Sequence, residues 1–271
     1  MRLLYLTSLL AITTLANVSA NDSTAAFGVG GLVFTKSDHI VMQEEDLFIS
    51  KDKIRIAYKF YNTSDKPITT RVAFPLPEIV LDADNSAFPD YTEADLRKDK
   101  NILKFSVVVD GKKQVFQSED KKRFDQDAQA YVHKITHYWM QTFPAKKVIL
   151  VNHEYTPGVG GGVGYGLQGE ESGIYCIDKS TKAWINNQLK AKYDIPTSTI
   201  TYILKTGANW KGAIGKFKLT IKKSDSNEKL SFCGSEVKKI DDKTFVMEKI
   251  NFIPKNDLNI IYFGIPYKIG E

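Results

Sequence analysis

The stretch that most constrains the fold runs from Ile54 to Pro77, because it holds two runs in which apolar and polar residues alternate. The first run, Ile54–Phe60, places branched and aromatic side chains at every second position. The second run, Ile68–Phe74, repeats this period of two, which is typical of half-buried strands. Turn-forming residues fill Asn62–Pro67 between them. The stretch therefore predicts a hairpin-like pair of strands and places the chain in the β class.

Similar short runs along the rest of the chain predict further strands. We expect strands at Gly30–Phe34, Ile40–Ser50, Leu103–Val109, Gln114–Gln117, Ile135–Phe143, Lys147–Tyr155, Ile200–Leu204, Lys216–Ile221, Leu230–Cys233, Thr244–Met247 and Leu258–Phe263. Many strands with few helices do not match the alternation of parallel α/β folds. The sequence therefore predicts a mainly β protein with an antiparallel β-sandwich architecture.

Two segments predict short helices within this architecture. Ser118 can cap a helix that runs to about Lys134, because acidic residues follow it where they favour a helix N-terminus. Ser180 can cap a second helix that runs to about Lys192, with Trp184 on its apolar face.

Residues 158–173 interrupt the strand pattern with a glycine-rich segment. We expect this segment to be a linker or loop between an N-terminal lobe of residues 21–157 and a C-terminal lobe of residues 174–271. One extended sandwich is an alternative organisation. The glycines do not predict a phosphate-binding loop, because no helix follows directly and no Gly-Lys-Ser/Thr motif is present.

The first twenty residues predict a secretory signal peptide rather than part of the fold. Arg2 precedes an apolar run, Leu3–Ala16, and Val18–Ala20 has the small residues of a cleavage site. Cleavage before Asn21 would leave an exported protein, periplasmic or secreted, with no later membrane-spanning segment. Removing Arg2 lowers the formal net charge from +5 to +4, and the lysines are scattered, so a nucleic-acid partner is not expected.

The two cysteines, Cys176 and Cys233, predict a disulfide, because an exported protein matures in an oxidising compartment. Two buried thiols are the alternative. Two cysteines alone are too few for a zinc site.

Several motifs along the mature chain together resemble a family of exported bacterial proteins known only as a domain of unknown function (family 4424). The motifs are Gly30–Asp38, Asp46–Ser50, Phe74–Pro77, Tyr138–Pro144, Tyr155–Gly161, Thr206–Trp210 and Phe232–Gly234. The resemblance implies a bacterial, extracytoplasmic setting. It implies no activity and no catalytic residues, because the family has none established.

The first half also resembles the VIT domain of inter-α-trypsin inhibitor heavy chains. The resemblance lies in the order of a strand, an Asn-x-Ser turn, a strand, Phe74–Pro77, Asp110-Gly111 and a charged segment with Ala128 and Tyr131. It implies a β-sandwich used for protein association, although a shared fold does not by itself imply a shared function.

The acidic segment after Pro77 suggests a calcium loop. Its oxygen-bearing residues fall at the EF-hand offsets 1, 3, 5, 9 and 12, and they are Asp82, Asp84, Ser86, Asp90 and Glu93. Ala87 stands where that loop needs glycine, so a solvated acidic loop is the alternative. No other cofactor is expected.

Three histidines raise the question of zinc. His133 and His137 are four residues apart, which would place both imidazoles on one face of a helix, and His153 could join them. The residue after His133 is a lysine rather than the glutamate of a zinc protease, so structural histidines are the favoured interpretation.

The remaining candidates are aromatic side chains that could line a binding groove: Trp210, Trp139 and Tyr165. Most aromatic residues of a β protein belong to its core, which is the alternative.

No spacing typical of nucleophilic catalysis occurs in the chain, which lacks a Gly-x-Ser-x-Gly elbow. We therefore expect a non-catalytic periplasmic binding or interaction module whose partner is a protein or a cell-envelope component. The alternative is a hydrolase of envelope polysaccharide or peptide that uses carboxylates of residues 82–95, because a catalytic carboxylate pair is set by distance in space.

Overall fold

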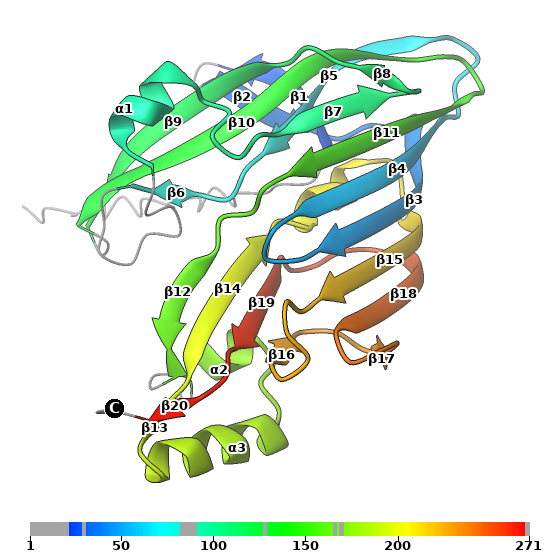
Figure 1. Cartoon of the computed structure of the whole chain (residues 1–271). Coiled ribbons are helices and arrows are strands. Elements are labelled where there is room, and N and C mark those ends of the chain that lie inside the picture. The colour runs from blue at the N-terminus through cyan, green and yellow to red at the C-terminus, as the bar shows by residue number, and fades with distance from the viewer. Residues whose placement is uncertain are drawn as a thin grey trace, which may run out of the picture.

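The computed structural model describes residues 22–28, 31–81, 91–126, 129–164, 167 and 171–268. These residues form a sandwich in which one long sheet packs against two shorter sheets (Figure 1). The chain is mainly β, and every strand pair within the described ranges is antiparallel except β15 with β3. The predicted fold class is confirmed.

The long sheet has eight strands in the order β17-β18-β15-β3-β4-β11-β7-β8. Their bounds in that order are Lys238–Lys239, Thr244–Phe252, Ile214–Lys222, Ile40–Ile49, Ile54–Asn62, Val148–Tyr155, Ser106–Val109 and Lys112–Lys113. Strands from before and after the glycine-rich segment therefore share one sheet.

The two shorter sheets lie against the inner face of the long sheet. The first has the order β2-β1-β5-β10-β6, with β9 also paired to β10, and spans Gly31–Thr35, Ser23–Gly28, Ile68–Pro75, Ala130–Phe143, Ile79–Val80 and, for β9, Gln117–Asp125. The second has the order β12-β14-β19-β16 and spans Gly160–Val163, Pro196–Tyr202, Leu258–Phe263 and Lys229–Phe232. A separate pair joins β13 (Tyr193–Asp194) to β20 (Tyr267–Lys268).

Short helices complete the fold. They are α1 (Glu93–Lys98), α2 (Glu171–Ile174), α3 (Lys179–Lys190) and a 3₁₀ helix at Lys205–Asn209. The predicted second helix is confirmed as α3, although its N-cap is Asp178, whose carboxylate accepts the Thr181 N–H at 2.7 Å. Ile185 is the buried residue on the inner face of this helix.

The two runs at Ile54–Pro77 form β4 and β5, but they do not pair as the predicted hairpin. β4 pairs with β3 and β11 in the long sheet, whereas β5 pairs with β1 and β10 in a shorter sheet. The connecting turn therefore carries the chain across the sandwich. The Asn62 amide fixes this corner, because it donates to the carbonyls of Lys66 and Phe143, each at 2.9 Å.

The predicted helix from Ser118 to Lys134 is wrong, because that segment forms β9 and the start of β10. Ser118 lies opposite His137 in the strand ladder and does not cap a helix. The charged residues of β9 lie on a strand that pairs with β10 alone among the described strands. Charged side chains commonly protect such an edge from pairing with another chain, so a charge-rich segment need not be helical.

The core fills the space between the sheets. Alternate residues of β4, namely Ile54, Ile56, Tyr58 and Phe60, are buried on the inner face. Residues 22–25 at the start of the described chain are buried too. The Trp210 indole N–H donates to the Asp22 carbonyl oxygen at 2.6 Å and so ties this segment to the core. A second, smaller cluster forms around Ile185 of α3 and Phe263 of β19.

The predicted disulfide is present, with the sulfur atoms of Cys176 and Cys233 bonded. It joins the segment after α2 to the end of β16, and the two Cα atoms are 5.0 Å apart.

Part of the glycine-rich segment expected as a linker or loop forms β12, which pairs with β14. A Cβ atom at Gly160 would lie 2.5 Å from the Thr199 Oγ1, so a larger residue here would force the Thr199 side chain to move. A Cβ atom at Gly161 would meet no atom within 4 Å.

We predict that Gly160→Ala lowers the free energy of unfolding by about 1–3 kcal/mol, because the added methyl overpacks the contact with Thr199. Urea unfolding followed by circular dichroism measures this change. Gly161→Ala is the matched control and is expected to be neutral. Adding Thr199→Ala to Gly160→Ala should restore most of the loss. Equal effects of the two alanine variants would contradict the steric explanation.

Candidate binding site

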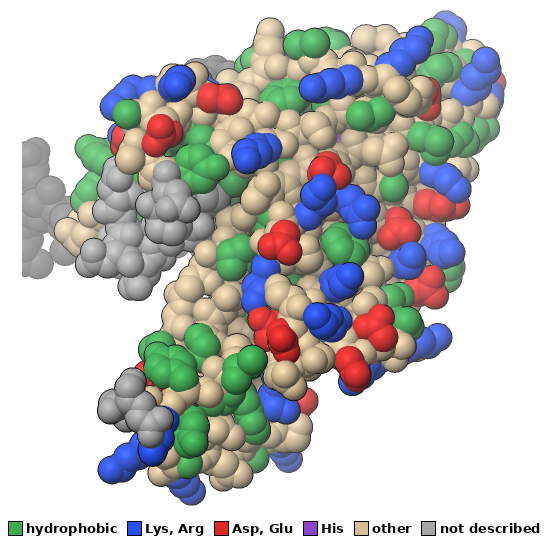
Figure 2. All heavy atoms as spheres, in the orientation of Figure 1, with side chains coloured by type: hydrophobic (Ala, Val, Ile, Leu, Met, Phe, Trp, Pro, Cys, Tyr) green, Lys and Arg blue, Asp and Glu red, His purple; other side chains and the backbone are tan. Residues whose placement is uncertain are grey.

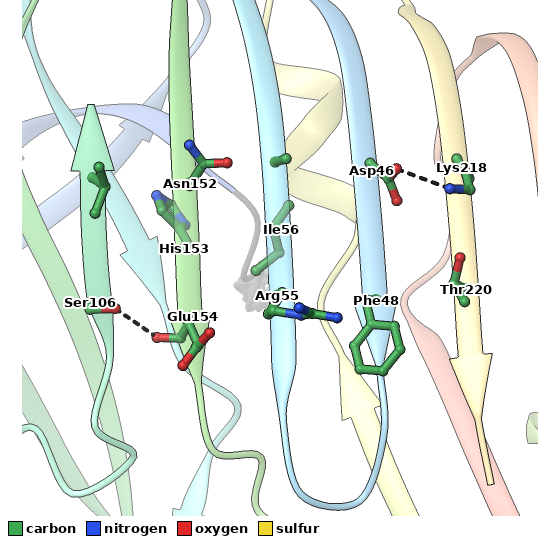
Figure 3. A pocket seen from close by; sticks show the side chains of 12 residues that line it. Asp46, Phe48, Arg55, Ile56, Ser106, Asn152, His153, Glu154, Lys218 and Thr220 are labelled. Carbon is green, nitrogen blue, oxygen red and sulfur yellow. Dashed lines mark hydrogen bonds and ion pairs between the residues drawn. The ribbon is translucent and has the colours of Figure 1, made fainter. Parts of the chain in front are cut away.

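The outer face of the long sheet carries a hollow of about 680 Å³, and it spans β15, β3, β4, β11 and β7 (Figure 3). Each of these strands buries alternate side chains in the core, so the intervening side chains point to solvent. Basic and acidic side chains are interspersed over this part of the surface (Figure 2).

The register of the strands arranges the outward side chains in two rows that cross the sheet. The first row is Lys218, Asp46, Ala57, Asn152 and Val108, and the second is Thr220, Phe48, Arg55, Glu154 and Ser106. Ala57, on the central strand β4, is an exposed residue with only a methyl side chain. The larger side chains around it line the hollow, and the small side chain of Ala57 leaves the space between them open.

Both acids of the hollow have lysine partners. The Lys218 ammonium lies 3.2 Å from the Asp46 carboxylate, and the Lys53 ammonium lies 2.7 Å from the Glu154 carboxylate. These ion pairs are solvent-exposed, and exposed pairs contribute only about 0–1 kcal/mol each. The acids can therefore exchange their partners at little energetic cost.

Arg55 differs from the other charged groups of the hollow. Its guanidinium carbon lies 4.6 Å from the centre of the Phe48 ring, a cation–π contact between neighbouring strands. Within the part of the chain that the structure describes, this guanidinium has no hydrogen bond and no ion pair. The Asn152 side-chain amide likewise has no hydrogen bond to a described residue. The Arg55 guanidinium and the Asn152 amide are therefore available to a bound molecule.

A cluster of buried polar groups lies on the inner side of the same sheet. The His153 imidazole and the Asp22 carboxylate are fully buried, with Nε2 and Oδ2 3.5 Å apart. Burial lowers the pKa of His153 to about 3, and the nearby His137 adds to this effect. Burial also raises the pKa of Asp22 well above its usual value, with a further contribution from Glu45. Burial therefore favours the neutral form of both side chains.

The three histidines do not form the zinc site that their spacing suggested. His133 and His137 lie on strand β10 instead of a helix. The two ring nitrogens of His133 contact the carboxylates of Asp120 at 2.9 Å and Glu93 at 2.8 Å. Nδ1 of His137 lies 2.8 Å from the Ser118 hydroxyl. No group of three or more His, Cys, Asp or Glu side chains in the described ranges is placed to share a metal ion.

The calcium hypothesis falls largely outside the described residues. Asp82, Asp84, Ser86 and Asp90 are not described, whereas Glu93 is the first residue of α1. The Glu93 carboxylate accepts hydrogen bonds from Lys122 at 2.6 Å and from His133 at 2.8 Å. Hydrogen bonds from these two side chains lower the pKa of Glu93.

The three aromatic residues that were candidates for a binding groove differ in their surroundings. Trp210 is 3% exposed and packs with its ring centre 4.5 Å from that of Phe60, so it supports the core and does not line a groove. Trp139 is 4% exposed and lies edge-on to the His153 ring. Tyr165 lies outside the described residues.

Sequence reasoning missed the residues that line the hollow. The alternating pattern of Ile54–Phe60 places Arg55 on the outward face of its strand. Its neighbours Phe48 and Glu154 come from strands that only the sheet register brings together. An outward alanine among larger polar residues is the one sequence signal that points to this site.

The fold and the hollow define an antiparallel β-sandwich protein with an open polar recess on one sheet. The chain belongs to the family described as Domain of unknown function (DUF4424), whose model matches residues 20–125 and 116–261. The chain is also similar in fold to a crystal structure from Legionella pneumophila subsp. pneumophila str. Philadelphia 1, named a "putative nutrient binding protein". That similarity has a TM-score of 0.54 at 20% identity and covers 90% of this chain and 70% of the other.

No curated protein sequence matches the chain. Within the described ranges, every helix is too short or too polar to cross a bilayer.

The buried histidines predict a loss of stability in acid. His137 and His153 have folded pKa values of about 4 and about 3, below the usual 6.5. The unfolded chain therefore binds more protons between pH 6.5 and about 3, and the free energy of unfolding should fall by a few kcal/mol across that window as the pH decreases. The raised pKa of Asp22 has the opposite effect on the free energy of unfolding, because this group binds its proton more readily in the folded chain.

Urea unfolding at a series of pH values tests this prediction. His153→Gln should reduce the slope of stability against pH below pH 6.5. His39→Gln, at an exposed position, is the matched control and should leave the slope unchanged. An unaltered slope in the His153 variant would contradict the assignment.

Proposed function

We propose that this protein is an exported, non-catalytic binding module that takes a small polar molecule or a polar group of an envelope component in the hollow of the long sheet. The observation that carries the proposal is the recess around Ala57, where Arg55 and Asn152 present polar heads without described partners. Recesses with a few convergent polar groups are the usual form of ligand sites.

The position of the hollow supports a binding role. Its lining comes from adjacent strands of one continuous sheet, and side chains on strands are held more rigidly than side chains on loops. A rigid site loses less conformational entropy when it binds, which favours affinity. The solved structure of similar fold carries a name that also refers to binding, but at 20% identity it supports the fold alone.

The chemistry of the hollow supports a role without catalysis. Asp46 and Glu154 each form an exposed ion pair with a lysine, so both carboxylates of the lining already have a charged partner. The Ser106 hydroxyl donates to the backbone carbonyl of Glu154 at 3.4 Å, so its proton is directed at the backbone and not at a carboxylate or an imidazole.

The predicted leader supports export, and so does the disulfide between Cys176 and Cys233, since such bonds persist in oxidising compartments. Residues 1–20 lie outside the described residues.

We predict that Ala57→Trp abolishes ligand binding while leaving the fold intact, because the indole fills the recess from an exposed position. Saturation-transfer NMR measures contact with a panel of amino acids, short peptides, monosaccharides and disaccharides. Thr142→Trp, an exposed position on the other outer face of the sandwich, is the matched control and should bind like the wild type. No contact with any panel compound, or equal contact in both variants, would count against the hollow as the binding site.

A further inference from the structure

We infer that the hollow recognises a carboxylate group on a zwitterionic molecule, such as a free amino acid or a short peptide, with Arg55 as the residue that binds the carboxylate. This inference names the ligand class and rests on the proposed function. It follows from the charge balance of the hollow, from the way Phe48 holds Arg55, and from the two acids that flank the guanidinium.

The charge balance leaves one cation without a described partner. Lys218 pairs with Asp46 within the hollow, and Lys53, outside its lining, pairs with Glu154, so Arg55 is the charged side chain of the lining without a described ion-pair partner. A guanidinium donates hydrogen bonds and accepts none, so it calls for an acceptor that carries negative charge. Carboxylates and phosphates both match its fork of N–H groups.

The Phe48 ring prepares Arg55 for this contact. The guanidinium carbon lies over the ring, 4.6 Å from its centre, and a guanidinium in contact with a ring face can still use the N–H groups at its edge to bind an anion. Figure 3 shows the Arg55 side chain extending across the sheet toward the strand that carries Phe48. The stacking also restricts the rotamers of a long side chain before any molecule binds, which lowers the entropy lost on binding.

Asn152 is a second polar group of the hollow, on the side of β4 away from Phe48. Arg55 pairs with Glu154 and Ala57 pairs with Asn152 in the β4–β11 ladder, so Asn152 lies diagonally across from Arg55. Diagonal neighbours on one face of a sheet are about 7–8 Å apart. The methyl group of Ala57 leaves the space beside Asn152 open, whereas the Arg55 side chain extends toward β3, so the Asn152 amide is placed to contact a different part of a bound molecule.

The flanking acids decide between the anions. Glu154 is the direct cross-strand neighbour of Arg55, and Asp46 is the cross-strand neighbour of Ala57. A carboxylate directly beside Arg55 disfavours a doubly charged phosphate more than a singly charged carboxylate. Their lysine pairs are exposed and weak, so either acid can accept hydrogen bonds from an ammonium group instead. A molecule with one carboxylate and one ammonium therefore complements the hollow.

Four matched compounds test the inference by isothermal titration calorimetry on the chain from Asn21 onward. They are L-alanine, which is a zwitterion, N-acetyl-L-alanine, which is an anion, L-alaninamide, which is a cation, and the neutral N-acetyl-L-alaninamide. We expect both compounds with a carboxylate to bind, L-alanine the more tightly, and both amides to bind at least about tenfold more weakly, in line with the loss of a charge-assisted hydrogen-bond pair.

Variants of Arg55 then test whether this residue binds the carboxylate. Arg55→Gln should remove the preference for carboxylates, and Arg55→Lys should restore only part of it, because an ammonium lacks the planar fork. Lys59→Gln is the matched control: it removes the same charge from the same face of β4, at a residue paired with Glu44 and outside the lining of the hollow. Thermal unfolding confirms that each variant folds.

Failure of the inference can be told apart from failure of the proposed function. If the amides bind as tightly as the acids, or if Arg55→Gln keeps the preference, the ligand class is wrong. If none of the four compounds binds but Ala57→Trp still removes contact with a sugar from the panel, the hollow is a binding site for another class and the carboxylate assignment is overturned. If neither experiment detects binding, both proposals are wrong.

Discussion

The structure depends on burial of one face of the long sheet. Its inward residues pack against both shorter sheets at once, so a single core joins segments that are far apart in the sequence. Phe60 of β4 shows how this works: its ring lies 4.5 Å from Trp210 and 6.0 Å from Phe143, which belong to different parts of the chain. Each large side chain buried in this way contributes about 1.5–3 kcal/mol, and the shorter sheets are stabilised through their common partner.

The same constraint creates the outer face. Because the side chains of a strand alternate, every residue committed to the core places its neighbours in solvent. His153 and Glu154 are adjacent in sequence, yet one is buried among aromatic rings and the other lines the hollow. The alternation of side chains along each strand thus produces both the apolar core and the charged rows of the hollow. The small side chain of Ala57 leaves the outer face open at that position.

The interior also holds polar groups, and burial decides their charge. Asp22 and His153 are removed from water without enough hydrogen bonds to stabilise ionised forms, so the neutral forms are favoured. Exposed charged groups and buried ionisable groups therefore have different roles in this molecule. Charged groups on the outer face are exposed to solvent, whereas burial of the ionisable groups in the core predicts that stability depends on pH.

The sequence by itself determined the class of the fold, most of the strands, helix α3 and the disulfide, because periodicity, capping and cysteine count are local signals. It could not determine that β4 and β5 lie in different sheets, or that residues 118–134 form strands, because local propensity gives way to long-range pairing such as that of Ser118 with His137. The hollow was decided by tertiary structure alone. Asp46, Arg55, Asn152 and Lys218 meet because the register of four strands aligns them, and register depends on how the whole inner face is buried.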